Sequence, residues 1–280
     1  MFEITDKKIL NPTVTEITVK APYVAAKAEA GQFIILRVDE EGERIPLTIA
    51  DFDREKGTVS VIFQIVGATT YLLNRLNVGD HLADFVGPLG NPTETNGLKK
   101  VAVIGGGVGC AIALPVAKKL HGQGATVHSV VGFRNKDLVI LENEFKKVSD
   151  KYLLMSDDGS VGEKGLVTDA LKKLIESGEK YDEVIAIGPL MMMKFVCKLT
   201  EEYGIKTVVS MNPVMIDGTG MCGGCRLSVG GKTKFACVDG PDFDGHEVDF
   251  DVAMNRGRNY REWEKHKYEE TCNLFRKEIK

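Results

Sequence analysis

Short runs of alternating apolar and polar residues occupy the chain from Phe2 to Val86. A period of two is typical of strands that bury one face, and it predicts strands over Val14–Val19, Phe33–Val38 and Thr58–Val66. Strands at this density, with little helix between them, predict a small antiparallel β-barrel. A short helix is expected over Thr69–Leu76, where threonines at its start can cap the first turn.

After the polar linker Asn91–Gly97 the pattern changes to continuous apolar runs that alternate with helical periods. The expected strands are 100–104, 125–131, 152–155, 183–188 and 207–209, with helices over 111–120 and 166–175. Strand and helix in alternation predict a doubly wound parallel sheet, which binds ligands at the carboxyl ends of its strands. The predicted fold class is therefore an N-terminal antiparallel β-barrel followed by an α/β doubly wound nucleotide-binding domain.

A glycine-rich loop follows the first of these parallel strands, with glycines at Gly105, Gly106, Gly107 and Gly109. It is similar to a dinucleotide-binding fingerprint, but position 110 is Cys where that fingerprint has glycine or alanine. The second strand ends in Arg134-Asn135-Lys136, without the acidic residue that holds a ribose hydroxyl. The loop alone is weak evidence for a nicotinamide nucleotide, and a purely structural strand–helix turn stays open.

Candidate chemistry is concentrated in the spacing Asp217-x4-Cys222-x2-Cys225-x11-Cys237. Plant-type [2Fe–2S] proteins use Cys-x4-Cys-x2-Cys…Cys, so the segment matches that pattern with an oxygen donor in the first position. Glycines at 218, 220, 223 and 224 leave room for inorganic sulfide and let backbone N–H groups face it. The spacing favours a [2Fe–2S] cluster.

These four residues are also compatible with centres of other kinds. Three thiolates and a carboxylate could hold a structural zinc ion, although zinc ligands rarely sit in such a glycine loop. A disulfide would leave one thiol over, and a thioredoxin-like Cys-x-x-Cys would not explain Cys237. Asp217 is in addition an ordinary turn former. The remaining cysteines, Cys110, Cys197 and Cys272, are expected to be inert buried thiols.

Two places in the predicted barrel can hold an anionic group. The residues concerned are Arg44, Pro46, Leu47 and Thr48 in one strand, and Gly67, Thr69 and Thr70 at the start of one helix. A guanidinium can bind a diphosphate through two parallel hydrogen bonds, and a helix N-terminus offers free N–H groups to phosphate. An ordinary structural role is open at each place, since Arg44 can be a solvated surface charge and Thr69 a plain helix cap.

The composition of the chain bears on which classes of partner it can bind. The 280 residues are 43% hydrophobic and 27% charged, with a net charge of −4, so there is no basic excess for nucleic acid. The sequence contains no signal-type segment at Met1–Lys8 and no apolar run of membrane-spanning length, which predicts no membrane insertion. Its cysteine usage fits a reducing compartment, and a cytoplasmic location is expected.

The order of these motifs resembles that of the ferredoxin–NADP reductase superfamily, and more closely the electron-transfer subunit of dihydroorotate dehydrogenase and its relatives. The resemblance covers roughly residues 2–245. It implies an FAD bound by Arg44, Pro46, Leu47 and Thr48, with Thr48 near the flavin N5 as the catalytic position. Further FAD contacts would fall on Gln64, Ile65, Val66 and Gly67, and pyrophosphate contacts on Thr69 and Thr70. The nicotinamide nucleotide would lie over Gly105–Gly109, beside the Asp157-Asp158 turn and Gly188-Pro189.

Aspartate at position 217 departs from the four cysteines of the dihydroorotate dehydrogenase subunit. It resembles the small subunit of electron-bifurcating NADH-dependent reduced ferredoxin:NADP oxidoreductase, also described as a sulfide dehydrogenase subunit. That resemblance implies an FAD and [2Fe–2S] oxidoreductase subunit with Asp217, Cys222, Cys225 and Cys237 as metal ligands. It would exchange hydride with NAD(H) and single electrons with a larger flavin/iron–sulfur partner in a heterodimer. The sequence does not choose between NAD(H) and NADP(H).

Two alternative functions remain at this point. An electron-transfer subunit of NAD-linked dihydroorotate dehydrogenase would need cysteine in place of Asp217. A non-redox nucleotide-binding module with structural zinc would lack flavin altogether.

The predicted domains are a FAD-binding barrel (1–96), an NAD(P)-binding domain (97–210), a [2Fe–2S] subdomain (211–245) and a C-terminal arm (246–280). The arm contains a helix-compatible run over 259–280 that is rich in aromatic and charged residues. It would either pack on its own domain or dock a partner subunit, and its Trp, Tyr and Arg content favours docking.

Overall fold

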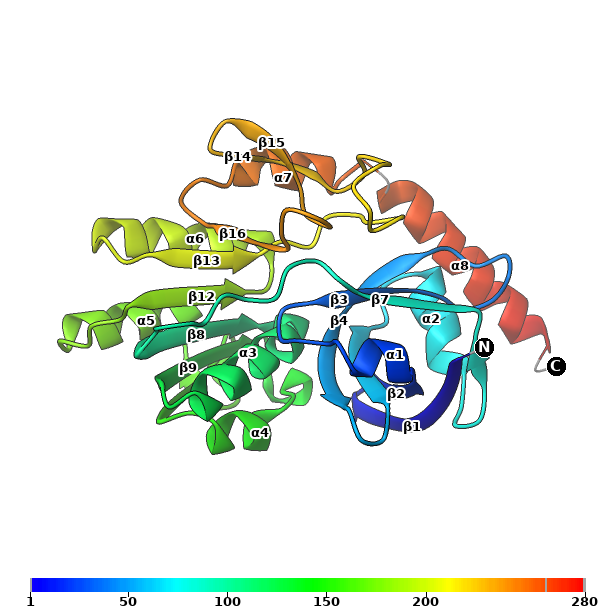
Figure 1. Ribbon diagram of the computed structural model, residues 1–280, viewed down its shortest axis with the longest axis horizontal. Coiled ribbons are helices and arrows are strands. Elements are labelled where there is room, and N and C mark those ends of the chain that lie inside the picture. The colour runs from blue at the N-terminus through cyan, green and yellow to red at the C-terminus, as the bar shows by residue number, and fades with distance from the viewer. Residues whose placement is uncertain (1, 260, 279–280) are drawn as a thin grey trace.

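The computed structural model describes residues 2–259 and 261–278. A β-barrel and an α/β sheet lie side by side, and a smaller region that carries a hairpin over residues 226–235 packs against the sheet (Figure 1). The C-terminal helix runs from this smaller region across the barrel, so the last part of the chain returns to the first.

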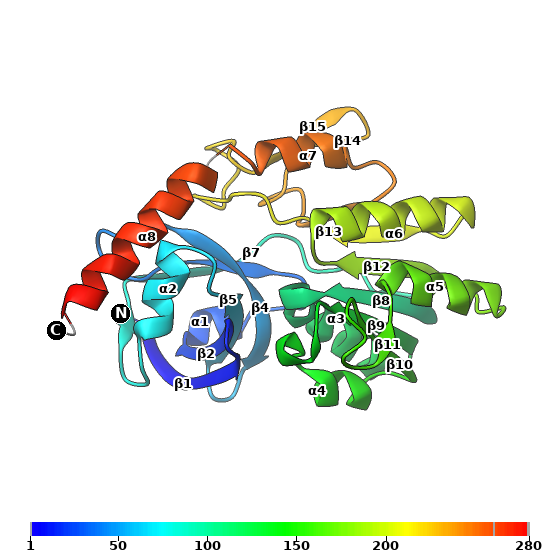
Figure 2. The same cartoon turned by 180° about the vertical axis from the view of Figure 1, so that it is seen from behind.

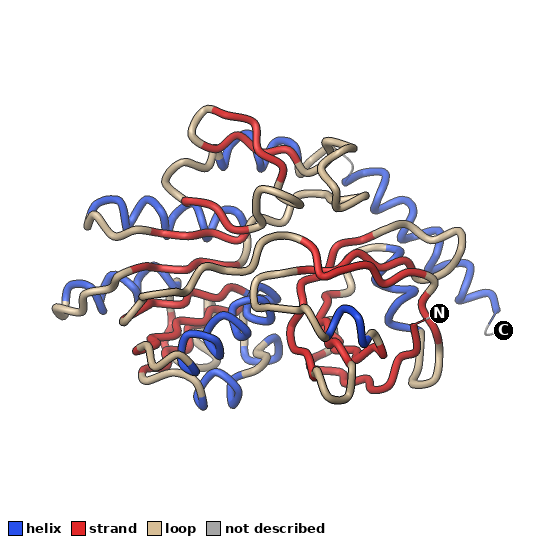
Figure 3. The backbone as a smooth tube through the Cα atoms, viewed as in Figure 1, coloured by secondary structure: helices blue, strands red, loops and turns tan. Residues whose placement is uncertain are grey.

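The barrel consists of seven antiparallel strands in the order β6-β1-β2-β5-β4-β3-β7. Their bounds are β1 (Phe2–Asn11), β2 (Val14–Lys20), β3 (Phe33–Arg37), β4 (Ile45–Asp53), β5 (Thr58–Gln64), β6 (His81–Leu82) and β7 (Asp84–Leu89). The edge strands β6 and β7 are separated only by Ala83, so the sheet is nearly closed (Figure 3). Helices α1 (Pro22–Ala25) and α2 (Ala68–Arg75) complete the domain, and the predicted barrel is confirmed.

The alternating apolar residues of the strands point into the barrel and form its core. In β2 the side chains of Ile17 and Val19 are fully buried, and Phe63 of β5 and Phe85 of β7 pack into the same apolar core. Burying such side chains stabilises the fold by about 1.5–3 kcal/mol each. The core is separate from those of the second domain, so the barrel has its own hydrophobic interior.

The second domain is a sheet in the order β11-β10-β9-β8-β12-β13-β16, in which every pair is parallel except β13–β16. Its strands are β8 (Lys100–Gly106), β9 (Thr126–Phe133), β10 (Lys151–Ser156), β11 (Glu163–Lys164), β12 (Glu183–Ile187), β13 (Thr207–Ser210) and β16 (Asp242–Asp244). The chain winds outward through β9 and β10, then crosses to β12 on the other side of β8. The switch point between β8 and β12 is where such sheets bind ligands.

Helices cover both faces of the sheet (Figure 2). One face packs against α3 (Cys110–Gly122) and α4 (Glu142–Lys147), and the other packs against α5 (Val167–Glu176) and α6 (Leu190–Glu202). Short 3-10 turns, η1 (Gly107–Gly109) and η2 (Lys136–Leu138), follow β8 and β9. The predicted doubly wound sheet is confirmed.

The chain leaves the sheet after β13, builds the hairpin β14 (Arg226–Val229) and β15 (Lys232–Phe235), and returns as β16 beside β13. Helix α7 (Phe250–Arg256) follows, with the Asp249 side chain accepting a hydrogen bond from Val252 N at 2.9 Å. Buried residues of the hairpin and α7 belong to the same apolar cluster as α5 and α6. This region is therefore packed onto the sheet and shares its core.

Helix α8 (Arg261–Glu278) lies along α2 in both views (Figures 1 and 2). The rings of Tyr71 and Tyr268 meet edge to face, with centroids 5.9 Å apart. The predicted tail helix thus packs on the barrel of its own chain. Cys272 on this helix is half-buried, so the expectation of a buried thiol is wrong there, whereas Cys110 and Cys197 are buried. Within the described residues, no helix combines the length and apolarity needed to cross a membrane.

Candidate redox site

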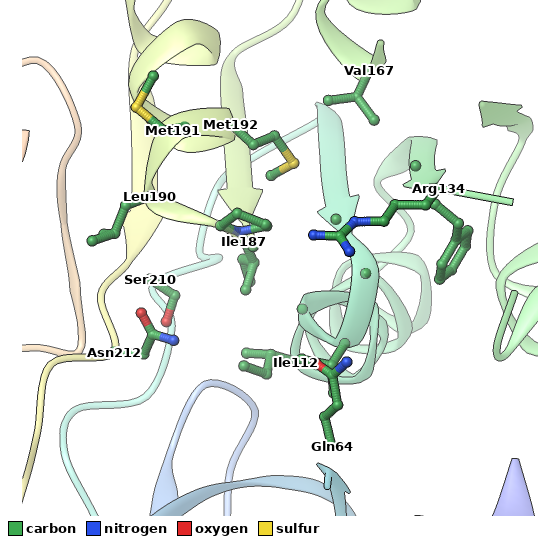
Figure 4. A pocket seen from close by; sticks show the side chains of 18 of the residues that line it. Gln64, Ile112, Arg134, Val167, Ile187, Leu190, Met191, Met192, Ser210 and Asn212 are labelled. Carbon is green, nitrogen blue, oxygen red and sulfur yellow. The ribbon is translucent and has the colours of Figure 1, made fainter. Parts of the chain in front are cut away.

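A cavity of about 1080 Å³ lies where the barrel meets the carboxyl ends of the parallel strands (Figure 4). The barrel contributes β4 and the end of β5, and the sheet contributes the loops after β8, β9, β10, β12 and β13. Figure 4 shows the guanidinium of Arg134 entering from one side and the polar ends of Ser210 and Asn212 on the opposite side. The switch point of the sheet therefore opens into a partly polar cavity whose opposite side is formed by the barrel.

The structure brings residues from both predicted binding sites to this cavity. The predicted residues on its wall are Pro46, Thr48, Gln64, Gly106, Gly107, Gly109, Asp157, Gly188 and Pro189. The predicted residues outside the wall are Arg44, Leu47, Ile65, Val66, Gly67, Thr69, Thr70, Gly105 and Asp158. A flavin ring beside Thr48 and a nicotinamide ring over the glycine loop would share one chamber, as hydride transfer between them requires.

The glycine loop is shaped by two local constraints. Gly107 has φ +54°, a left-handed conformation that favours glycine, and the space around its Cα is open. A Cβ on Gly109 would lie 2.6 Å from Ile187 O and 2.7 Å from Gly188 Cα, so the two loops at the switch point touch through backbone. The turn η1 leads directly into helix α3, and Gly107, Val108 and Gly109 line the cavity, so this helix begins at the cavity, where a phosphate can bind.

Cys110 accounts for the departure from the usual fingerprint. The thiol is fully buried, and a Cβ on Gly105 would lie 2.8 Å from Cys110 Sγ. Burial raises the pKa of the Cys110 thiol, which keeps it neutral and inert. The side chain therefore fills the contact between strand β8 and helix α3 that a third glycine closes in other proteins.

The predicted diphosphate site lies beside the cavity. Arg44 Nε is buried and has no hydrogen-bond partner within the described part of the protein, which is costly unless an acceptor is supplied from outside. The Thr70 hydroxyl accepts hydrogen bonds from Val66 N at 3.0 Å and Gly67 N at 3.1 Å, so it fixes the start of α2. Thr69 Oγ1 donates to a neighbouring carboxylate of the barrel at 3.4 Å. An orphaned guanidinium nitrogen and a helix N-terminus fit the phosphates of FAD.

The turn after β10 is hydrogen-bonded to the end of β9. Asp157 N donates to Phe133 O at 3.1 Å, and Lys136 N donates to Ser160 Oγ at 2.8 Å. Hydrogen bonds from Ser160 lower the pKa of the Asp158 carboxyl. Asp158 thus shapes the turn, while its neighbour Asp157 reaches the cavity wall.

Two contacts join the four predicted cluster ligands, one through a backbone N–H and one between two sulfurs. Asp217 Oδ2 accepts a hydrogen bond from Cys222 N at 2.8 Å, and Cys225 Sγ lies 3.2 Å from Cys237 Sγ. Backbone N–H groups of Thr219 and Cys222 lower the pKa of Asp217, which keeps the carboxylate ionised and able to ligate. Cys222 is exposed, whereas Cys225 and Cys237 are buried.

Among the described residues, no group of three possible ligands converges on one point, for a zinc ion or for a cluster. The choice between the two centres therefore rests on the ligand spacing. A disulfide would bring two sulfurs to about 2.05 Å, and all six cysteines are free. A [2Fe–2S] cluster asks for two protein donors on each iron. Asp217, Cys222 and Cys225 in the glycine loop, with Cys237 after the hairpin, have the spacing that fits this requirement.

Comparison with known proteins agrees with this geometry. The family model for the iron–sulfur cluster binding domain of dihydroorotate dehydrogenase B matches residues 212–249. A Thermotoga maritima homologue of the dihydroorotate dehydrogenase B (NAD(+)) electron transfer subunit is 47% identical and covers 95% of this chain and 94% of its own. The electron transfer subunit from Streptococcus mutans is 32% identical, covering 89% and 97%.

The chain belongs to the family of dihydroorotate dehydrogenase B electron-transfer subunits and their homologues. A solved structure of NADH-dependent reduced ferredoxin–NADP oxidoreductase, studied for flavin-based electron bifurcation, superposes with a TM-score of 0.92 at 46% identity. The match covers 97% of this chain and 98% of that one. The predicted resemblance, the predicted oxidoreductase class and an iron–sulfur binding domain at 212–249 are confirmed. The individual site residues remain predictions.

Sequence reasoning missed one wall of the cavity. Ser210 is the last residue of β13 and Asn212 follows it, and the rule that ligands bind at carboxyl ends would have found them. Arg134 ends the second strand of the sheet, but the sequence assigns it no role. Met254 and Arg258 reach the cavity from the tail, and no local signal in the sequence marks them.

Proposed function

We propose that this chain is an FAD and [2Fe–2S] electron-transfer subunit that exchanges hydride with NAD(H) and single electrons with a larger flavin/iron–sulfur subunit. The relative of bifurcating type supports this assignment, as an NADH-dependent reduced ferredoxin–NADP oxidoreductase. The observation that carries the proposal is the shared cavity, which Thr48 of the barrel and the glycine loop of the sheet both line.

Each part of the chain has a defined task in this proposal. Arg44 and the start of α2 bind the FAD phosphates, and Thr48 lies beside the reacting edge of the ring. Gly107 and Gly109 let the nucleotide approach the backbone. Bound FAD supplies two-electron and one-electron chemistry together, and the cluster supplies one-electron transfer.

An exposed apolar surface around the cluster loop supports a partner subunit. Met221 is 89% exposed beside Cys222, and Val214, Ile216 and Val238 are also exposed. Large apolar side chains gathered on a surface are typical of protein interfaces. We infer that the larger subunit covers this surface and receives electrons there. The free cysteines further support a cytoplasmic, reducing setting.

An electron-transfer role in a dihydroorotate dehydrogenase complex is the second candidate. The 47% identical relative carries that name as a homologue, which favours this candidate directly. Position 217 separates the two candidates, because this chain has aspartate where that subunit is expected to have cysteine.

Anaerobic purification tests the proposal. We expect flavin absorbance, two irons and two acid-labile sulfides per chain, and bleaching of the flavin on addition of NADH. A colourless protein that contains zinc would contradict the proposal and support a regulatory nucleotide-binding module.

Substitution of Asp217 tests its role as a ligand. Asp217→Cys should retain a cluster with an altered EPR spectrum and midpoint potential, because thiolate is the softer and more covalent donor. Asp217→Ala should lower the iron content. Asp239→Ala is a matched control, since its carboxylate accepts a hydrogen bond from Phe235 N in the same region. Unchanged spectra in both Asp217 variants would make this residue a turn former only.

A further inference from the structure

The charge of the cavity wall is uneven. Within the described residues, the charged side chains that line it are Arg134, Asp157 and Arg258. Arg134 and Asp157 come from the ends of β9 and β10, as expected for a doubly wound sheet. Arg258 comes from the segment between α7 and α8, which lies outside the nucleotide-binding domain in sequence. The tail therefore adds a cation to a site built by the sheet.

Several contacts hold this segment in place. Phe250 and Ala253 of α7 are buried in the core shared with the sheet, and Lys194 of α6 forms an ion pair with the first turn of α7 at 2.7 Å. Arg256 Nη2 donates to a backbone carbonyl of the cluster loop at 3.2 Å. Arg258 N donates to the end of α7 at 3.2 Å. The backbone that carries Arg258 is therefore anchored to α6 and to the cluster loop.

The side chain of Arg258 has no internal partner. Across residues 2–259 and 261–278, its guanidinium forms no hydrogen bond or ion pair, and the same holds for Arg134. Some other arginines are paired, since Arg37 forms an ion pair with Asp84 at 2.8 Å and Arg256 donates to a backbone carbonyl. A guanidinium stays charged at any physiological pH. Both residues are exposed and line the same cavity, so their guanidinium groups are available to an anionic ligand there.

We propose that Arg258 binds a phosphate of the nicotinamide dinucleotide, so that the C-terminal segment completes the nucleotide site. The inference rests on the proposed function and extends it. FAD has its own phosphate site at Arg44 and the start of α2, which leaves the cavity cations for the second nucleotide. The dinucleotide carries two phosphate charges between its ribose groups. The N-terminus of α3 and the cations Arg134 and Arg258 can surround such a pyrophosphate.

Equilibrium binding to the intact, cofactor-loaded protein tests this role without measuring turnover. Isothermal titration would give Kd values for NAD+ and for ADP-ribose, which keeps both phosphates but lacks the nicotinamide ring. Arg258→Ala should weaken both ligands by about ten- to a hundredfold, as expected for a charged hydrogen bond. Arg258→Lys should lose less affinity, because it keeps the charge without the planar fork. Both losses should shrink at high salt in comparison with the wild type.

Lys265→Ala is the matched control, since it removes one cation from the exposed face of α8, away from the cavity. Flavin and cluster absorbance, with the thermal midpoint, would establish that each variant is folded and loaded. Unchanged Kd values for folded Arg258→Ala would overturn the inference. A loss confined to NAD+, with ADP-ribose unaffected, would overturn the phosphate assignment and place Arg258 at the nicotinamide end. Failure of the wild-type protein to bind either ligand would instead count against the proposed function.

Discussion

The amino and carboxyl ends of the parallel strands differ in whether their charged groups have partners within the described part of the protein. At the amino ends, Glu179 bridges Lys100 and Lys151, and Asp182 accepts hydrogen bonds from Lys99 N at 2.7 Å and Lys100 N at 2.9 Å. At the carboxyl ends, glycines leave the backbone bare, and the arginine side chains on the cavity wall have no partner among the described residues.

The difference shows which end is built for stability and which for binding. Both ends are rich in charge, so charge alone does not locate the site. At the amino ends the charged groups Glu179, Asp182, Lys100 and Lys151 bind one another or the backbone, whereas the carboxyl ends leave donors for a ligand. Substitutions at the two ends should therefore separate loss of stability from loss of nucleotide binding.

The largest effect is expected from Gly109→Ala at the carboxyl end. The new methyl group would press against the backbone at Ile187 and Gly188, which cannot move without opening the switch point. We expect a loss of about 1–3 kcal/mol in the free energy of unfolding and more than tenfold weaker NAD+ binding. Denaturant titration and calorimetry would measure both. Gly122→Ala at the far end of α3 is the control, because a Cβ there meets no atom within 4 Å.

Arg134→Ala should affect binding without affecting stability. The guanidinium extends into the cavity, and removing it deprives no internal group of a partner among the described residues (Figure 4). NAD+ affinity should fall about tenfold, and the free energy of unfolding should stay within about 0.5 kcal/mol of the wild type. If Arg134→Ala lowered the stability but left the NAD+ affinity unchanged, the carboxyl ends would serve stability, contrary to our expectation.

Tyr181→Phe should show the opposite behaviour near the amino ends. The Tyr181 hydroxyl lies 2.8 Å from His128 Nδ1, and burial lowers the pKa of His128, which keeps the imidazole neutral. Removing the hydroxyl leaves a buried ring nitrogen without this partner, at a cost of about 1 kcal/mol. Chemical denaturation should detect the loss, while the Kd for NAD+ should be unchanged. Weaker nucleotide binding would show that the two ends are coupled.

The smallest change is expected from Glu179→Gln, and it should depend on pH. Hydrogen bonds from Lys100 and then Lys151 lower the pKa of Glu179 to about 2. A carboxyl with a lowered folded-state pKa stabilises the protein above its unfolded pKa and loses that contribution as the pH falls. The variant should be less stable than the wild type at pH 7, and the difference should vanish as the pH falls from about 5 towards 2. A difference independent of pH would assign the effect to packing.

Much of this architecture follows from local sequence. Alternation between Val14 and Val66 is enough to predict the barrel, because a strand that buries one face must alternate. The cysteine spacing is enough to predict the iron–sulfur region, since ligands must converge within a short loop. Both features depend on residues close together in the chain, so they can be recognised in the sequence.

Further features depend on contacts between distant segments. Strand β16 has only three residues, too short to show a period, and its place beside β13 is fixed by pairing. Helix α8 is mostly charged, so its packing on α2 through Tyr268 could not be distinguished from docking on another protein. Arg258 joins the cavity because α7 is anchored to α6, a tertiary relation without a sequence signature.

The pairing of Ser210 with Asp242 also bears on how such a protein can be assembled or redesigned. Because these two residues are cross-strand partners, everything between them enters and leaves the host sheet at adjacent points. A short turn could connect them without changing the path of any other strand, and insertions are tolerated best where their ends lie close together. The iron-binding segment is thus inserted at one point of the sheet. Because its buried residues share the core of the sheet, a graft between the matching strands of a simpler reductase would have to include the surface on which they pack.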